Sequence, residues 1–187
     1  MVAEAVVKET EAGRVPSSEG WFVLNAREAR WVHREGRGES LPFTGWADEE
    51  AAGFPQVGVN LFVLGPGEPM SMYHREADQE DFLVLSGEAV LVVEGEERRL
   101  REWDFVHCPP QASHVILGAG TGACVVLAIG ARAYAAEETG WGAYTVDETA
   151  QRHGAGVTQE THDPRVAYAR YVKSRPTAYR EGWLPGE

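Results

Sequence analysis

Short apolar runs, separated by turn residues, fill the middle of the chain. The runs that read as strands cover residues 57–64, 82–85, 89–93, 105–106, 115–117 and 124–129. Glycine and proline residues interrupt the sequence between them at close intervals. Several short strands with this punctuation are typical of an antiparallel sandwich or barrel. The pattern therefore predicts an all-β protein with a barrel core over about 56–132.

Two glycine-containing dipeptides predict hairpin turns within this core. Ser86-Gly87 ends one apolar run, and Glu94-Gly95 ends the next. Glycine adopts positive φ without steric cost, which two-residue hairpin turns require.

Most of the predicted strands are apolar at every position instead of alternating with polar residues. A sheet with one solvated face would alternate, so both faces of these strands are expected to be covered. The second cover must come from the ends of the chain or from a partner subunit. We therefore predict a homodimer, with cover by the chain's own ends as the alternative.

The two flanks of the core differ from it in character. Residues 1–19 are polar and predict a flexible N-terminal arm, and 20–187 predict a single domain in which 21–24 is the clearest strand before the core. Residues 133–187 predict a helical extension. Its Asp163-Pro164 suits the start of a helix running to about Lys173, and a shorter helix is expected from Asp147 to His153.

Length and charge narrow the classes of function. The 187 residues suffice for one domain, and 29 acidic against 17 basic residues give a net charge of −12. That charge argues against nucleic acid or an anionic membrane as partner. The first residues lack an apolar stretch of signal-peptide length, and only two cysteines are present, so we expect a cytoplasmic protein without a disulfide framework.

Four side chains in the core carry the candidate chemistry. His74 and Glu76 are two apart, so on a strand they face the same side, and the polar segment 77–79 predicts a turn that returns Glu80 to that interior. His114 begins a later apolar strand. Two imidazoles and two carboxylates form a ligand set suited to a divalent metal ion: Fe, Mn or Zn.

These residues resemble the motifs of the cupin superfamily, including its small single-domain members. The first cupin motif ends in Glu, six residues, Gly, as Glu80 and Gly87 do here, and its first metal histidine lies six residues before that Glu, as His74 does. The second motif is matched by Pro109 and His114. The resemblance implies a double-stranded β-helix, or jelly roll, with a metal held by His74, Glu80 and His114.

Several motif positions depart from the family pattern. Glu68 stands where the first motif begins with glycine, and Trp103, Gln111 and Gly118 depart from the second motif. Glu76 replaces the usual second histidine. It either ligates the metal, giving a site of two His and two Glu, or swings outward to pair with an arginine and leaves three ligands.

The resemblance implies two main classes of function. One is a mononuclear-metal enzyme of oxygenase, isomerase or decarboxylase type that acts on a small oxygen-rich molecule. The other is a non-catalytic module that binds a sugar or other small molecule and holds a structural metal. A metal-free barrel is a third possibility, but an inward-facing cluster of carboxylates and histidines is costly without a cation.

Overall fold

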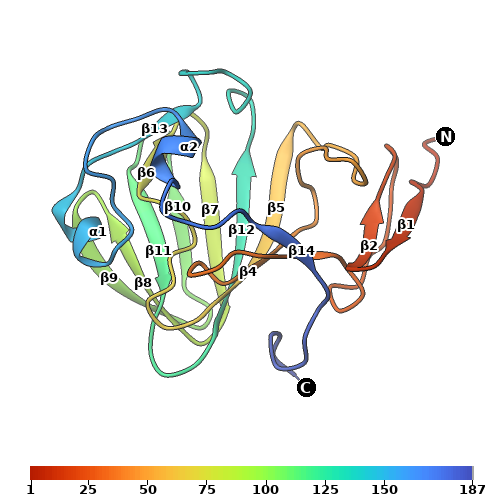
Figure 1. Ribbon diagram of the computed structural model, residues 1–187, viewed down its shortest axis with the longest axis horizontal. Helices are drawn as coiled ribbons and strands as arrows, with labels where there is room; N and C mark the ends of the chain where they lie inside the picture. The colour runs from red at the N-terminus through yellow and green to blue at the C-terminus, as the bar shows by residue number, and fades with distance from the viewer. Residues whose placement is uncertain (187) are drawn as a thin grey trace.

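The chain is built almost entirely of antiparallel β-structure, which confirms the predicted all-β jelly roll. The computed structural model describes residues 1–186 and arranges its strands in three sheets (Figure 1). The seven-stranded sheet contains, in spatial order, β10 (Phe105–Cys108), β7 (Glu80–Ser86), β12 (Cys124–Ala131), β5 (Val57–Leu64), β4 (Glu39–Pro42), β3 (Trp31–His33) and β14 (Arg175–Thr177). The five-stranded sheet contains β13 (Gly142–Tyr144), β6 (His74–Glu76), β11 (His114–Gly118), β8 (Glu88–Val93) and β9 (Glu96–Arg101).

The remaining elements lie at the two ends of the chain. The small third sheet pairs β1 (Val7–Thr10) with β2 (Gly13–Pro16), and Figure 1 shows it on the far side of the molecule from β8 and β9. The helices are α1 (Glu148–Arg152) and α2 (Pro164–Ala167). The segment predicted as a flexible arm thus contains a hairpin, and its flexibility stays a prediction. Within the described residues, no helix is both long and apolar enough to cross a membrane.

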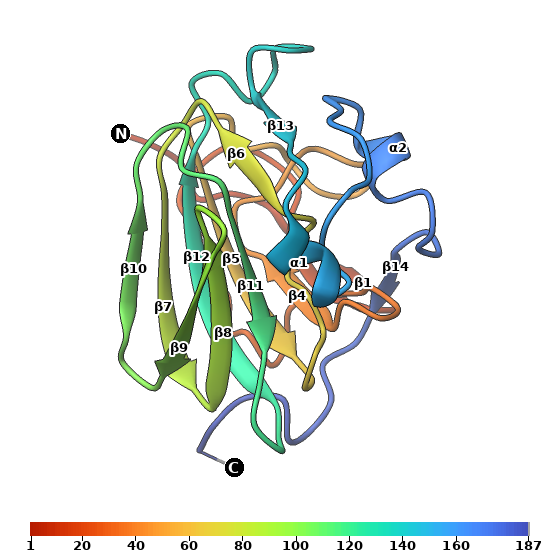
Figure 2. The ribbon, with the colours of Figure 1, turned by 90° about the vertical axis from the view of Figure 1, so that its left-hand side faces the viewer.

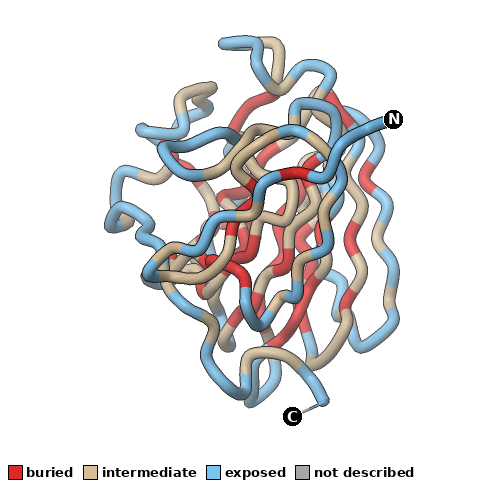
Figure 3. Tube along the Cα trace, turned by 90° about the vertical axis from the view of Figure 1, so that its right-hand side faces the viewer, coloured by how far each residue is buried: buried red, intermediate tan, exposed pale blue. Residues whose placement is uncertain are grey.

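The main core lies between the two large sheets. Val84 of β7 and Val126 of β12 pack there with Leu91 of β8 and Ile116 of β11, each buried. The two cysteines, Cys108 and Cys124, belong to the same cluster as free thiols. Figure 3 shows the buried residues concentrated in the strands, with exposed residues in the surrounding loops.

The outer face of the seven-stranded sheet is covered by the two ends of the chain itself. Trp31 of β3 is fully buried there, 5.1 Å from the ring of Trp183, and its indole N–H donates to the carbonyl of Ala26. Leu61 and Val125 of the sheet belong to this second core. The chain's own ends therefore cover this face of the sheet, which was the predicted alternative to cover by a partner subunit.

The outer face of the five-stranded sheet is covered by α1 and the residues after it. Ala150 and Ala155 pack against Val92 and Val115. Tyr73 is buried in this outer cluster, and its hydroxyl accepts a hydrogen bond from the backbone N–H of Gly95. Tyr73 thus points away from the barrel interior, as the alternation from His74 predicts.

One of the two predicted hairpins is wrong. Glu94-Gly95 does join the antiparallel neighbours β8 and β9, with both residues at positive φ. Ser86-Gly87 instead takes the chain from one large sheet to the other, since β7 pairs with β10 and β12 and not with β8. A side chain at Gly87 would meet the carbonyl oxygen of Ala123 at 2.5 Å, so close approach and positive φ both require glycine there.

Two other predicted elements differ from the observed ones. Residues 21–24 are no strand: Trp21 makes one bridge to Glu4, while Phe22 and Leu24 pack through their side chains without a neighbouring strand. The helix capped by Asp163 stops at Ala167, because Tyr168 departs from helical geometry. The hydroxyl of Tyr168 accepts a hydrogen bond from the backbone of Met72, a tertiary contact that overrides weak local helical preference. The predicted helix after Asp147 is confirmed as α1, with Asp147 as its N-cap.

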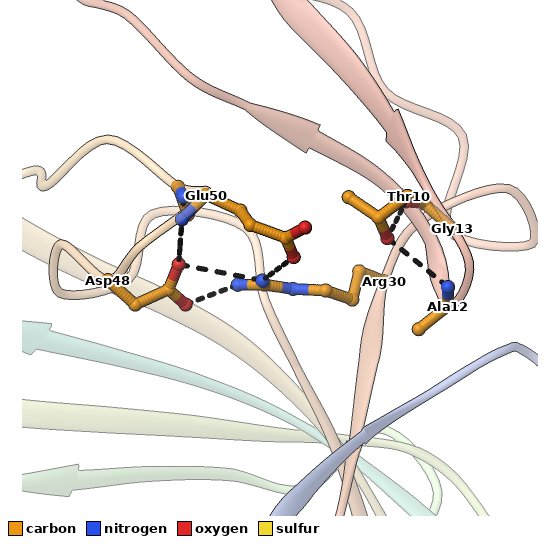
Figure 4. A network of polar contacts seen from close by, with 7 residues as sticks. Thr10, Ala12, Gly13, Arg30, Asp48 and Glu50 are labelled. Atoms are coloured by element: carbon orange, nitrogen blue, oxygen red, sulfur yellow. Dashed lines mark hydrogen bonds and ion pairs between the residues drawn. The ribbon is translucent and has the colours of Figure 1, made fainter.

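Arg30 fastens the loop between β4 and β5 to the N-terminal part of the fold. Its buried guanidinium lies between the carboxylates of Asp48 and Glu50, beside the β1–β2 turn (Figure 4). Asp48 also accepts hydrogen bonds from the backbone N–H groups of Glu50 and Ala51, which fixes the loop internally. This loop carries Trp46, which lines the cavity described below.

Candidate metal centre

The two large sheets bring the predicted histidines and Glu80 together inside the barrel. His74 begins β6 and His114 begins β11, and these residues are direct partners across the antiparallel pair. Glu80 begins β7 of the opposite sheet, after the corner at 77–79. The carboxylate therefore faces both imidazoles from across the core.

The donor atoms of these three residues are spaced like the ligands of one ion. Oε2 of Glu80 lies 3.2 Å from Nε2 of His114 and 3.5 Å from Nε2 of His74, and one donor atom from each residue lies within 4.8 Å of the others. Atoms bound at about 2.0–2.2 Å to one metal lie about 3.0–3.5 Å apart when adjacent. The set thus fits a divalent metal ion.

Backbone carbonyls orient both imidazoles. Nδ1 of His74 donates to the carbonyl of Met72 at 2.8 Å, and Nδ1 of His114 donates to the carbonyl of Ala112 at 3.0 Å. A neutral ring held in this way presents the lone pair of Nε2 to the site. Metal-binding histidines are oriented by the same kind of hydrogen bond from the second nitrogen.

Two buried polar atoms at the centre lack hydrogen bonds. Oε2 of Glu80 and Nε2 of His114 are shielded from solvent, and neither has a hydrogen-bond partner among residues 1–186 despite their proximity. Buried polar atoms are rarely left unpaired, since each costs about 1–3 kcal/mol. A bound cation would satisfy both.

The electrostatics of the metal-free protein also favour positive charge at this point. Burial alone would lower the pKa of His74, but contacts with the Glu76 and Glu80 carboxylates outweigh it and raise that pKa to about 10. Burial likewise opposes the shift at His114, where Cys108 and Glu80 raise the pKa to about 9. The two histidines in turn hold the pKa of Glu80 well below its usual range, against the effect of its burial.

Glu76 lies at the edge of this group. Its Oε1 is 3.5 Å from Nε2 of His74, but Glu76 is not among the residues whose donor atoms converge. It also makes no ion pair with an arginine among the described residues. Burial lowers the pKa of Arg132, and the negative charge of Glu76 opposes that shift only in part. Its role as a fourth ligand stays a prediction.

A cavity of about 520 Å³ opens onto the centre. His74, Glu76 and Glu80 line it, together with the aromatic rings of Phe62 and Tyr144. A volume of this size accommodates a small organic molecule beside the three donors.

Sequence reasoning missed most of the other residues that line this cavity. Arg34, Arg37, Tyr144 and Tyr168 come from segments before and after the predicted barrel core. The segment from residue 20 to about 55 is rich in Trp and Arg, but no spacing in it marks these two arginines as part of a site. Their position depends on how the flanks fold over the barrel.

The middle of the chain matches the profile of a known protein family. Residues 60–130 match the profile of a family described as "Cupin domain". This segment includes His74, Glu80 and His114. No functionally curated protein matches the chain.

Solved structures with similar folds include two described as sugar phosphate isomerases. One, a putative sugar phosphate isomerase from Acidithiobacillus ferrooxidans, is 34% identical over 41% of this chain and 51% of its own, with a TM-score of 0.40. The other, a cupin-superfamily sugar phosphate isomerase from Silicibacter pomeroyi, is 27% identical over 57% of this chain and 62% of its own, with a TM-score of 0.43. A cupin from Bacteroides fragilis is 22% identical over 45% of this chain and 72% of its own, with a TM-score of 0.40. The chain thus matches less than two thirds of the length of the two isomerases.

The family profile matches the segment that carries the barrel and its three converging donors. The strand topology around that segment is the jelly roll that the sequence motifs imply. Residues 60–130 of the chain therefore form a cupin domain.

Proposed function

We propose that this cupin holds one divalent metal ion through His74, Glu80 and His114, with Glu76 beside them as the candidate for a fourth ligand. The observation that carries the proposal is the convergence of one donor atom from each of His74, Glu80 and His114, of which Oε2 of Glu80 and Nε2 of His114 are buried and form no hydrogen bond. Two imidazoles and a carboxylate suit Fe, Mn or Zn.

The proposed activity is that of a mononuclear-metal enzyme acting on a small oxygen-rich molecule. When bound, the metal would polarise a carbonyl or hydroxyl oxygen of the ligand as a Lewis acid. Three converging donors beside a cavity of about 520 Å³ favour coordination positions that remain open toward a ligand. Oxygenase, isomerase and decarboxylase reactions all fit such a centre, because fold does not choose among them.

Protein purified without chelators should contain close to one equivalent of Fe, Mn or Zn. Elemental analysis would measure the amount, and anomalous scattering from crystals would place the ion. We expect the anomalous peak within coordination distance of His74 and His114. A stoichiometry near zero after exposure to each of the three metals would contradict the proposal.

The second candidate function is a non-catalytic module that binds a sugar or other small molecule around a structural metal. It is favoured by the 3.5 Å separation of Glu76 Oε1 and His74 Nε2, because a fourth protein ligand would close a tetrahedral site. The two functions therefore differ in whether Glu76 binds the metal: the non-catalytic module requires it as a ligand, and the enzyme does not.

Replacing Glu76 with glutamine should weaken metal binding by no more than about tenfold, or about 1.4 kcal/mol. The converging set does not include Glu76, and the shape of the side chain is preserved. Competition against a fluorescent chelator would measure the affinity. A loss as large as that caused by removing His114 would instead support a closed four-ligand site and the non-catalytic function.

We also propose the ligand class, the oligomeric state and the location of the protein. The small-molecule ligand, the homodimer and the cytoplasmic location remain predictions, as does the absence of nucleic-acid and membrane partners. Exposed Phe105 of the edge strand β10, and Trp103 in the turn before it, offer apolar surface to a second copy of the chain.

A further inference from the structure

Two arginines face the cavity without an acidic partner. Arg34 and Arg37 line the same cavity as His74 and Glu80. Although the chain carries a net charge of −12, neither guanidinium is in an ion pair with any carboxylate of the part that the structure describes. Other arginines do have such partners: Arg30 has Asp48 and Glu50.

Both arginines belong to the turn that joins β3 to β4. The backbone N–H of Arg37 donates to the carbonyl of Arg34, and the N–H of Arg34 donates to the carbonyl of Gly38. Gly38 has a φ of +66°, and a side chain there would meet the carbonyl oxygen of Val63 at 2.1 Å. The turn is thus pressed against β5, which fixes the two arginines at the cavity wall.

The Arg34 side chain is fixed by hydrogen bonds that use only some of its N–H donors. Nη1 donates to the carbonyl of Met70 at 2.7 Å, Nη2 donates to the carbonyl of Arg37 at 2.6 Å, and the guanidinium lies 4.7 Å from the ring centre of Phe62. The residue is 7% exposed, and its Nε is buried without a hydrogen-bond partner. A guanidinium has five N–H groups, so donors remain for a ligand.

Arg37 is positioned by aromatic stacking alone. Its guanidinium lies 4.4 Å from the ring centre of Tyr168 and 5.1 Å from that of Tyr171, while its buried Nε has no partner. Within residues 1–186, this side chain donates no hydrogen bond. The N–H groups of its guanidinium are therefore unpaired within the described residues.

A continuous row of aromatic rings connects the arginines with the candidate metal centre. The ring of His74 lies 5.9 Å from that of Tyr144, which lies 5.5 Å from that of Tyr168, the ring beneath Arg37. The cavity therefore combines carboxylate and imidazole donors with the guanidinium groups of Arg34 and Arg37 in its wall. A single small molecule can contact both.

The proximity of two unpaired guanidinium groups is electrostatically unfavourable. Burial and the nearby charge of Arg37 lower the pKa of Arg34 to about 9. By contrast, Arg132, the third arginine of the cavity, donates to the carbonyl of Phe54 at 2.8 Å and stacks 4.3 Å from the ring centre of Trp46. An anion between Arg34 and Arg37 would relieve the repulsion, and planar forks of N–H groups match oxyanions.

We propose that Arg34 and Arg37 bind an oxyanion group, phosphate or carboxylate, of the same small molecule whose oxygen atoms meet the metal. This inference deepens the proposed function and rests on it for the metal end only. The substrate class is then an acidic hydroxy or keto compound.

Titration of Mn²⁺-loaded protein with inorganic phosphate and, in a separate arm, with acetate tests the proposal by calorimetry. Arg37→Gln should weaken binding of the preferred anion by about tenfold or more, as expected for losing charge-assisted hydrogen bonds. Arg99→Gln is the matched control, because Arg99 is exposed on β9 and its loss changes net charge equally. That control should bind the anion as the unmodified protein does.

The outcomes separate this inference from the proposed function. Thermal unfolding confirms that each variant is folded, and Arg37→Lys, which keeps the charge but loses the fork, should bind with intermediate affinity. Manganese content should be equal in all variants. Phosphate or acetate binding that is absent, or that survives Arg37→Gln unchanged, overturns the inference even if the metal is present. Arg37-dependent anion binding in protein that takes up no metal would support it while refuting the metal centre.

Discussion

Replacing His114 with alanine should remove tight metal binding, lowering the affinity by more than about 100-fold. Changes to groups that merely orient metal ligands cost about 10–100-fold, so loss of a direct ligand must cost more. His114 is 1% exposed, and its Nε2 lies 3.2 Å from Oε2 of Glu80, so it is one of the three converging donors. Metal content after dialysis against a buffered metal solution measures the effect.

The matched control is His107→Ala. His107 lies on β10, is exposed, and contacts Asp81 outside the barrel instead of the candidate centre. Its loss should leave the metal content unchanged. Equal metal content in His114→Ala and the unmodified protein would require another ligand set and would remove the main support for the proposed centre.

Replacing Trp31 with alanine should lower the free energy of unfolding by about 3–5 kcal/mol, the usual cost of removing a large buried aromatic side chain. Trp31 is fully buried, and its ring packs at a tilt against the rings of Tyr179 and Trp183 in the C-terminal segment. The substitution would therefore loosen the cover over the outer face of the sheet as well as create a cavity. Urea unfolding of metal-free protein measures it, since a bound metal would add its own stabilisation.

Trp21→Ala serves as the control for this measurement. Trp21 is 53% exposed, so its loss should change the free energy of unfolding by about 0.5 kcal/mol or less. If Trp31→Ala cost as little as Trp21→Ala, the ends of the chain would not form a second core.

The barrel was predictable because most of its strands coincide with short apolar runs. The run at 57–64 coincides with β5, and the donors at His74, Glu80 and His114 follow from motif spacing. Strand alternation also places Tyr73 on the opposite face from His74. These features depend on local sequence and on a periodicity of two residues, which the fold preserves.

The missed features depend on contacts between distant parts of the chain. Ser86-Gly87 has the composition of a hairpin turn, but the strand pairing that decides its role is not local. The helix after Asp163 ends early because Tyr168 contacts Met72 and Arg37, and neither contact is visible in the helix's own sequence. Arg34 and Arg37 enter the site for a similar reason, through the packing of the β3–β4 turn on β5.

The residues that line the cavity and the metal centre come from two parts of the chain: one supplies the metal donors, and the other supplies part of the cavity wall. The three converging donors lie within the segment 60–130 that matches the cupin profile, whereas Arg34, Arg37 and Tyr168 of the cavity wall lie outside it. Substitutions in the flanks can therefore alter which molecule fits without touching a metal ligand. Two cupins with the same donor triad need not share a substrate, and the flanking segments are the place to compare them.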